Sequence, residues 1–141
     1  MTFQQYYKGN FTSTLRWPQL DELWKRVIAD PEGWYIYHTG EKPPIDSVDK
    51  NTLQQFIQKI DKLLHQEHKY DYCGIVYADN QVAPTMIKIF DPKNLGVVCG
   101  VGKSTILPRW ILTRIVPEVI ETEVKTKYKR WLFGTDNAKN Y

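Results

Sequence analysis

The chain has little cysteine and no long apolar run. Cys73 and Cys99 are the two cysteines among 141 residues, too few for the disulfide framework of small secreted domains. No stretch approaches the ~20 consecutive apolar residues that a membrane-spanning helix needs. The opening residues MTFQQYYKGN lack the charged and apolar regions of a secretory signal. We therefore expect a cytoplasmic protein that does not associate with a membrane.

An excess of charge of one sign is also missing. The formal net charge is +3, too small to indicate nucleic-acid binding by itself. Aromatic residues are abundant, with five Trp and nine Tyr, which argues against a disordered chain. The length suits one domain. We expect a polar and aromatic arm over residues 1–16, one domain over 17–120 and a basic, partly flexible segment over 121–141.

Two segments have the apolar spacing of amphipathic helices. The first covers residues 18–29 after Trp17, with Pro18 in the first turn, where its missing N–H costs nothing. The second covers residues 50–67. In each segment, apolar residues recur at i, i+3, i+4 and i+7, as in a helix that packs on a core. The stripes are Leu20, Leu23, Trp24, Val27 and Ile28 in the first, and Leu53, Phe56, Ile57, Ile60, Leu63 and Leu64 in the second.

Four segments alternate in the manner of β-strands, and short connections between them favour antiparallel pairing. They are residues 34–39, 70–78, 85–90 and 110–116, with a short fifth strand expected at 96–102. Residues 106–116 could instead form a helix, but Pro108 and the β-branched residues of this segment favour a strand. The sequence therefore predicts an α+β fold, a two-layer sandwich with a mainly antiparallel sheet of four to five strands and two helices packed on one face. Because Lys88 is the only charge inside its strand, we expect its face of the sheet to be the more open one.

The run Gly102-Lys103-Ser104 looks like the end of a phosphate-binding P-loop. That motif needs a glycine five residues before Gly102, where the chain has Val97, and a helix immediately afterwards. Pro108 falls in the first turns of such a helix. We predict a glycine-rich surface turn that does not bind ATP.

Cys73, Cys99, His65 and His68 are candidates for thiol or metal chemistry. The two cysteines lie on neighbouring candidate strands and suit either buried small hydrophobes or a redox pair. His65 and His68 have the i, i+3 spacing of one helical face, and Cys73 follows five residues after His68. A structural zinc site needs four ligands, however, and no fourth is evident. We predict reduced structural thiols. Thiol redox, metal or haem binding is the alternative, and the sequence identifies no cofactor.

Two further patterns have a functional and a structural interpretation. Asp71, Asp79 and Asp91 flank the central strands, where a carboxylate pair could do acid–base work, although such residues more often cap turns. Basic and aromatic residues alternate between 124 and 131, as in single-stranded nucleic-acid binding. Glu121 and Glu123 weaken the positive field there, so we expect a solvated tail.

No nucleophile–base signature appears, and aromatic residues are enriched at interfaces. The leading hypothesis is a non-catalytic binding or accessory protein. It would contact a protein partner, a second copy of itself or a small ligand through the aromatic sheet face or the loop 91–108. The candidate binding residues are Lys88, Phe90, Asp91, Lys103, Ser104, Arg109 and Trp110.

Overall fold

The computed structural model describes residues 2–14, 16–67, 75–91 and 107–120. In these residues an antiparallel five-stranded sheet has the order β1-β3-β4-β5-β2. This architecture confirms the predicted α+β fold class. The elements are α1 (Phe3–Tyr7), β1 (Thr12–Ser13), α2 (Trp17–Ala29), β2 (Tyr35–His38), α3 (Lys50–Glu67), β3 (Val76–Ala78), β4 (Met86–Ile89) and β5 (Trp110–Thr113).

The centre of the sheet is the β3–β4 hairpin followed by β5. Val76 is paired with Ile89, and Ala78 with Ile87. The carboxylate of Asp79 closes the hairpin, because its Oδ1 accepts hydrogen bonds from the backbone N–H groups of Thr85 at 2.9 Å and Met86 at 3.0 Å. Asp79 is therefore a turn residue. The segment 106–116, for which a helix was the alternative prediction, contains the strand β5. This strand pairs with both β4 and β2.

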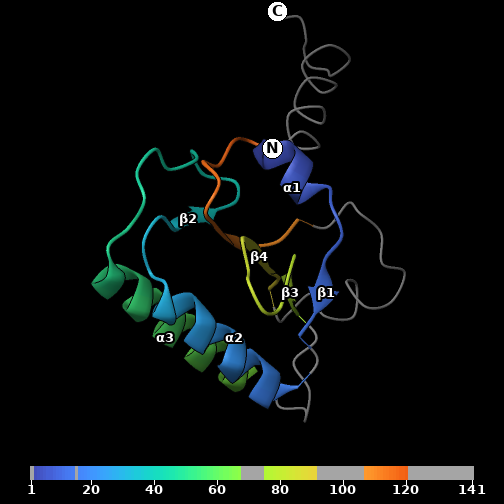
Figure 1. Ribbon diagram of the computed structural model, residues 1–141, viewed down its shortest axis with the longest axis vertical. Helices are drawn as coiled ribbons and strands as arrows, with labels where there is room; N and C mark the ends of the chain where they lie inside the picture. The colour runs from blue at the N-terminus through green and yellow to red at the C-terminus, as the bar shows by residue number, and fades with distance from the viewer. Residues whose placement is uncertain (1, 15, 68–74, 92–106, 121–141) are drawn as a thin grey trace, which may run out of the picture.

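Helices α2 and α3 cover one face of the sheet, as Figure 1 shows. The two predicted stripes point into the main core, with their edge residues Ile28, Phe56 and Leu63 only partly buried. The helices run antiparallel, since Trp17 at the start of α2 stacks on His65 near the end of α3. The fully enclosed helix residues are Leu20, Leu23, Val27, Leu53 and Leu64, and they pack over Val76, Ala78, Ile87, Ile89 and Leu112 of the sheet.

The opposite face of the sheet is covered in part by the N-terminal residues. It is still the more open face, because Tyr77 and Lys88 are half-buried there, whereas Ile87 and Ile89 on the helix side are fully buried. Residues 2–14, expected as an arm, form α1 and the edge strand β1. Phe3 is fully buried in a second core with Tyr37, Met86 and Ile111. Figure 1 shows α1 on the side of the sheet away from α2 and α3. Side chains alternate between the two faces of a strand, so β2, β4 and β5 present Tyr37, Met86 and Ile111 to this face. Burial of these apolar side chains favours a cover.

None of the helices in the described residues has the length and apolar content that crossing a membrane requires.

Candidate functional site

Lys88 lies on the α1 side of the sheet, where it holds the N-terminal residues against β4. Its Nζ donates a hydrogen bond of 2.8 Å to the carbonyl oxygen of Tyr7. The same nitrogen lies 4.0 Å from the ring centroid of Tyr7 and 3.9 Å from that of Phe11. Burial lowers the pKa of Lys88 to about 8, because a low-dielectric environment disfavours the ammonium form. These contacts give Lys88 a structural role.

Three of the predicted binding residues meet at the end of β4 and the start of β5. Arg109 Nη1 lies 3.3 Å from Asp91 Oδ2, and the Arg109 guanidinium carbon lies 4.4 Å from the ring centroid of Trp110. His38 at 5.9 Å and Phe56 at 6.4 Å flank the same indole ring. Trp110 is only 9% exposed. Three predicted binding residues therefore lie together around an enclosed aromatic ring, and their binding role stays a prediction.

Phe90, also a predicted binding residue, makes an edge contact with Tyr77 at a centroid distance of 5.6 Å and is partly buried against the main core. Lys103, Ser104, Cys73, Cys99 and His68 lie outside the described residues, so their predicted roles stay predictions. The same holds for Asp71 and for the basic residues between 124 and 131.

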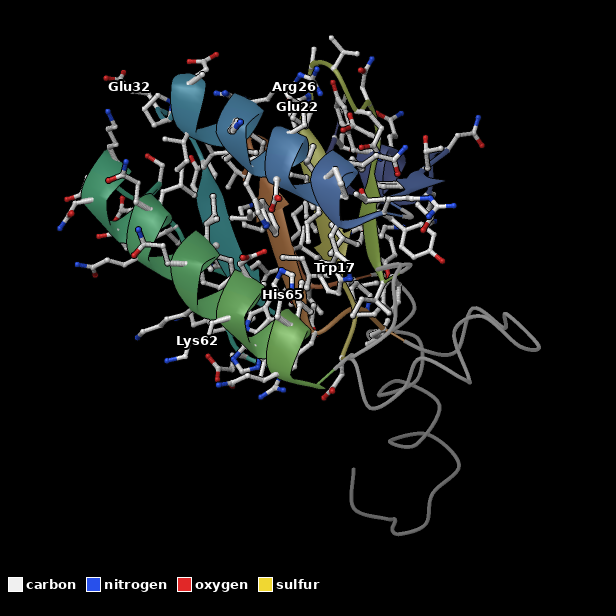
Figure 2. All side chains as sticks on the ribbon, turned by 90° about the horizontal axis from the view of Figure 1, so that it is seen from below. Trp17, Glu22, Arg26, Glu32, Lys62 and His65 are labelled. Atoms are coloured by element: carbon white, nitrogen blue, oxygen red, sulfur yellow. The ribbon has the colours of Figure 1, made fainter. Side chains whose placement is uncertain are left out.

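His65 joins the two long helices. Its ring stacks on Trp17 at a centroid distance of 3.9 Å, and Figure 2 shows the two residues facing each other between α3 and α2. His65 Nε2 also lies 3.7 Å from Asp61 Oδ2. Asp61 in turn accepts a hydrogen bond of 3.2 Å from the indole N–H of Trp24. In the part of the chain that the structure describes, no group of three or more His, Cys, Asp or Glu residues could hold a metal ion.

A surface hollow lies between the end of α2 and the beginning of α3. It has a volume of about 510 Å³ and opens to solvent. We call it the helix hollow. Its wall is mainly apolar, and the bond from Trp24 to Asp61 fixes the largest wall residue in place. The residues that line the helix hollow are Trp24, Lys25, Ile28, Ala29, Pro31 and Lys50.

The two lysines of the helix hollow have no ion-pair partner within the described residues. The helix hollow therefore combines an apolar wall with two lysines that form no ion pair within the described residues. None of the described residues that line it is a carboxylate. Sequence reasoning missed this site, because Lys25 and Lys50 are ordinary solvated positions on their own helices. The sequence could have indicated the site only through the expectation that α2 and α3 pack antiparallel. That packing places the end of the apolar stripe of α2 beside the start of the stripe of α3.

A second hollow, of about 330 Å³, lies between α2 and the β3–β4 hairpin. Its two arginines already have partners. Arg26 lies 3.8 Å from Glu22. Arg114 lies 3.2 Å from the carboxylate of Asp30 and donates to the carbonyl oxygens of Asp30 and Glu32 at 2.6 Å each. This arrangement joins the turn after α2 to the end of β5, so we assign it a structural role.

The chain matches no known family model, no curated protein and no solved structure. Function is therefore inferred from side chains and geometry alone.

Proposed function

We propose that the protein is a non-catalytic binding or accessory protein that contacts a protein partner or a small ligand through the helix hollow. The observation that carries this proposal is an open, mainly apolar wall, accessible at Ile28 and Ala29 above the nearly buried Trp24. Beside it lie the ammonium groups of Lys25 and Lys50, which form no ion pair within the described residues. An apolar centre with polar groups at its rim is the usual anatomy of a protein interface. A lysine at the edge can add a charge-assisted hydrogen bond to an incoming oxygen atom.

The contacts of the acidic and imidazole side chains support a binding role over acid–base catalysis. Asp79 closes the hairpin, and Asp91 pairs with Arg109. Asp61 pairs with His65 and accepts from Trp24, whereas His38 lies 3.1 Å from Glu41. A general acid or base must be able to reach a substrate proton, and each of these groups has a structural partner instead.

The helix hollow replaces the aromatic sheet face as the proposed contact surface, because α1 covers that face. The loop between Asp91 and Arg109 remains a second place where a partner could bind; the ion pair joins its two ends. The alternatives of thiol redox, metal or haem chemistry depend on Cys73, Cys99 and His68, and the nucleic-acid alternative depends on residues after Ile120. All of these lie outside the described residues, so we do not develop them.

Fragment mapping by amide NMR tests the proposed surface. The probes are phenylpropionate, phenylpropanol and phenylpropylamine, which share one apolar group and differ in charge. We expect chemical-shift changes at the Trp24 indole N–H, Ile28 and Ala29, largest for the carboxylate. Changes confined to the Asp91–Arg109 end of the sheet, or no changes at any residue, would contradict the proposal.

A steric variant provides the control for this mapping. Ala29 is exposed at the end of α2, so Ala29→Tyr should fill part of the helix hollow and abolish the shift changes with little effect on folding. Gln58→Tyr introduces the same side chain at an exposed position of α3 that does not line the helix hollow, and it should leave fragment binding unchanged. Equal binding by both variants would place the fragments elsewhere.

A further inference from the structure

We infer that the helix hollow receives an acidic, apolar-anchored segment of a protein partner. This inference rests on the proposed function and adds the chemistry of the occupant. It follows from the shape of the hollow, from the charges around it and from the charge of the chain's own C-terminal segment.

The shape of the helix hollow favours a protein segment over a small molecule. Small-molecule sites are usually enclosed and bury about 70–90% of the ligand surface. The helix hollow opens to solvent between two antiparallel helices, so a small molecule there keeps much of its surface in water. A helix or extended segment can lie across the opening and place one or two apolar side chains against Ile28 and Ala29. Docking of an amphipathic helix in an apolar groove is a common recognition mode.

The charge around the helix hollow favours acidic side chains on that segment. Lys25 lies on α2 and Lys50 is the first residue of α3, so the cations come from both helices. The N-terminus of α3 adds the positive end of a helix dipole. Asp49 is the nearest carboxylate in sequence to Lys50, and it accepts a hydrogen bond of 2.8 Å from the backbone N–H of Thr52. That bond lowers the pKa of Asp49, so the carboxylate stays ionised as a helix cap. Its charge offsets the dipole of α3, so the two lysines carry the preference for acidic side chains.

The chain's own C-terminal segment has the wrong charge to be the occupant. Lys125, Lys127, Lys129 and Arg130 follow one another closely in the sequence, and like charges near Lys25 and Lys50 repel. We therefore assign the helix hollow to another protein. Complementary charge at such a surface raises the association rate and excludes partners of the wrong sign.

Selection from a displayed library of random peptides of about 16 residues, long enough for a helix of about four turns, tests the inference on the full chain. We expect enriched peptides to combine aromatic or aliphatic residues with net negative charge. Their affinity should fall at least about tenfold, or about 1.4 kcal/mol, for the double variant Lys25→Glu/Lys50→Glu. The matched control is Lys59→Glu/Lys62→Glu, which makes the same charge change on exposed positions of α3. Figure 2 shows Lys62 on the outer side of α3. The control should bind within about twofold of the unaltered chain, a difference near 0.4 kcal/mol.

Several outcomes would overturn the inference. Enrichment of neutral or basic peptides would refute the acidic chemistry, and so would acidic peptides that bind the Lys25→Glu/Lys50→Glu variant as tightly as the unaltered chain. Binding to vesicles containing phosphatidylserine, without peptide enrichment and lost in the same variant, would identify a membrane surface instead. If the fragments still bind in the helix hollow but no acidic peptide is enriched, the proposed acidic segment is refuted and the proposed binding function stands. If fragments avoid the helix hollow, both proposals fail.

Discussion

The side-chain nitrogen of Lys88 lies 2.8 Å from the carbonyl oxygen of Tyr7, although the two residues are 81 positions apart in the chain. This bond joins the end of α1 to the middle of β4. The rings of Tyr7 and Phe11 enclose the same nitrogen and favour its charged form, whereas burial disfavours that form and lowers the pKa to about 8. The attachment of the N-terminal residues should therefore depend on pH.

We predict that the free energy of unfolding rises as the pH increases from about 8 toward 10.5. Folding lowers the pKa of Lys88 from 10.5 to about 8, so in this interval the unfolded chain keeps a proton that the folded chain has lost. Stability increases with pH wherever the unfolded state binds more protons. The gain should be on the order of 1 to 2 kcal/mol after allowance for solvent screening.

Urea unfolding at several pH values, compared between the unaltered chain and Lys88→Met, measures this effect. Methionine keeps the length and apolar stem of lysine but cannot titrate, so the difference between the two curves isolates Lys88 from other groups that ionise in the same range. A stability of the unaltered chain that falls relative to Lys88→Met would show that the contacts with Tyr7 and Phe11 outweigh burial.

Phe3→Ala should reduce the free energy of unfolding by about 3–5 kcal/mol, the usual cost of truncating a buried aromatic side chain. Phe3 is fully buried and contacts the rings of Tyr7 and Tyr37 at centroid distances of 6.2 and 6.1 Å. Asn10→Ala, at an exposed position of the same segment, should change stability by less than about 0.5 kcal/mol. Thermal or urea unfolding measures both. A loss below about 1 kcal/mol for Phe3→Ala would mean that α1 does not cover the sheet.

The long helices and the antiparallel sheet could be predicted because their signals are local. The stripes of α2 and α3 repeat over several turns, and the β-branched residues of β5 lie between prolines. The five-residue helix α1 is too short to show a helical period. The segment that contains Phe3 and Tyr7 was therefore predicted to be a polar and aromatic arm. The strand order is not local either, since β5 lies between β4 and β2.

The candidate site was harder to predict for the same reason. Asp91, Arg109 and Trp110 lie near one another at the ends of adjacent strands, and the short connection between their strands made this proximity foreseeable. Lys25 and Lys50 line one hollow only because α2 and α3 run antiparallel. Neither residue differs from a solvated lysine until the two helices are paired.

Arg114→Ala should destabilise the protein by about 1–3 kcal/mol, because it removes charge-assisted hydrogen bonds to two backbone carbonyls. The guanidinium donates to Asp30 and Glu32 and lies 4.5 Å from the ring centroid of Trp34. Arg109→Ala is the control, since Arg109 is more exposed and its ion pair with Asp91 lies near the surface, although its guanidinium also covers the ring of Trp110; it should cost about 0–1 kcal/mol. Equal losses for the two variants in urea unfolding would contradict a special role for Arg114.

The last prediction concerns Cys73 and Cys99, which lie outside the described residues. We expect two reduced thiols that react slowly. Their sequence neighbours are apolar or small, with Tyr72 and Gly74 beside Cys73, and Val98 and Gly100 beside Cys99. A thiol in apolar surroundings has a raised pKa and is inert, whereas a reactive thiol needs a nearby cation or a helix N-terminus. Labelling with iodoacetamide followed by mass spectrometry, with the denatured chain as the fully reactive reference, measures both rates. Rapid labelling of either cysteine in the folded protein, or a disulfide between them, would favour the thiol redox hypothesis over a purely structural role.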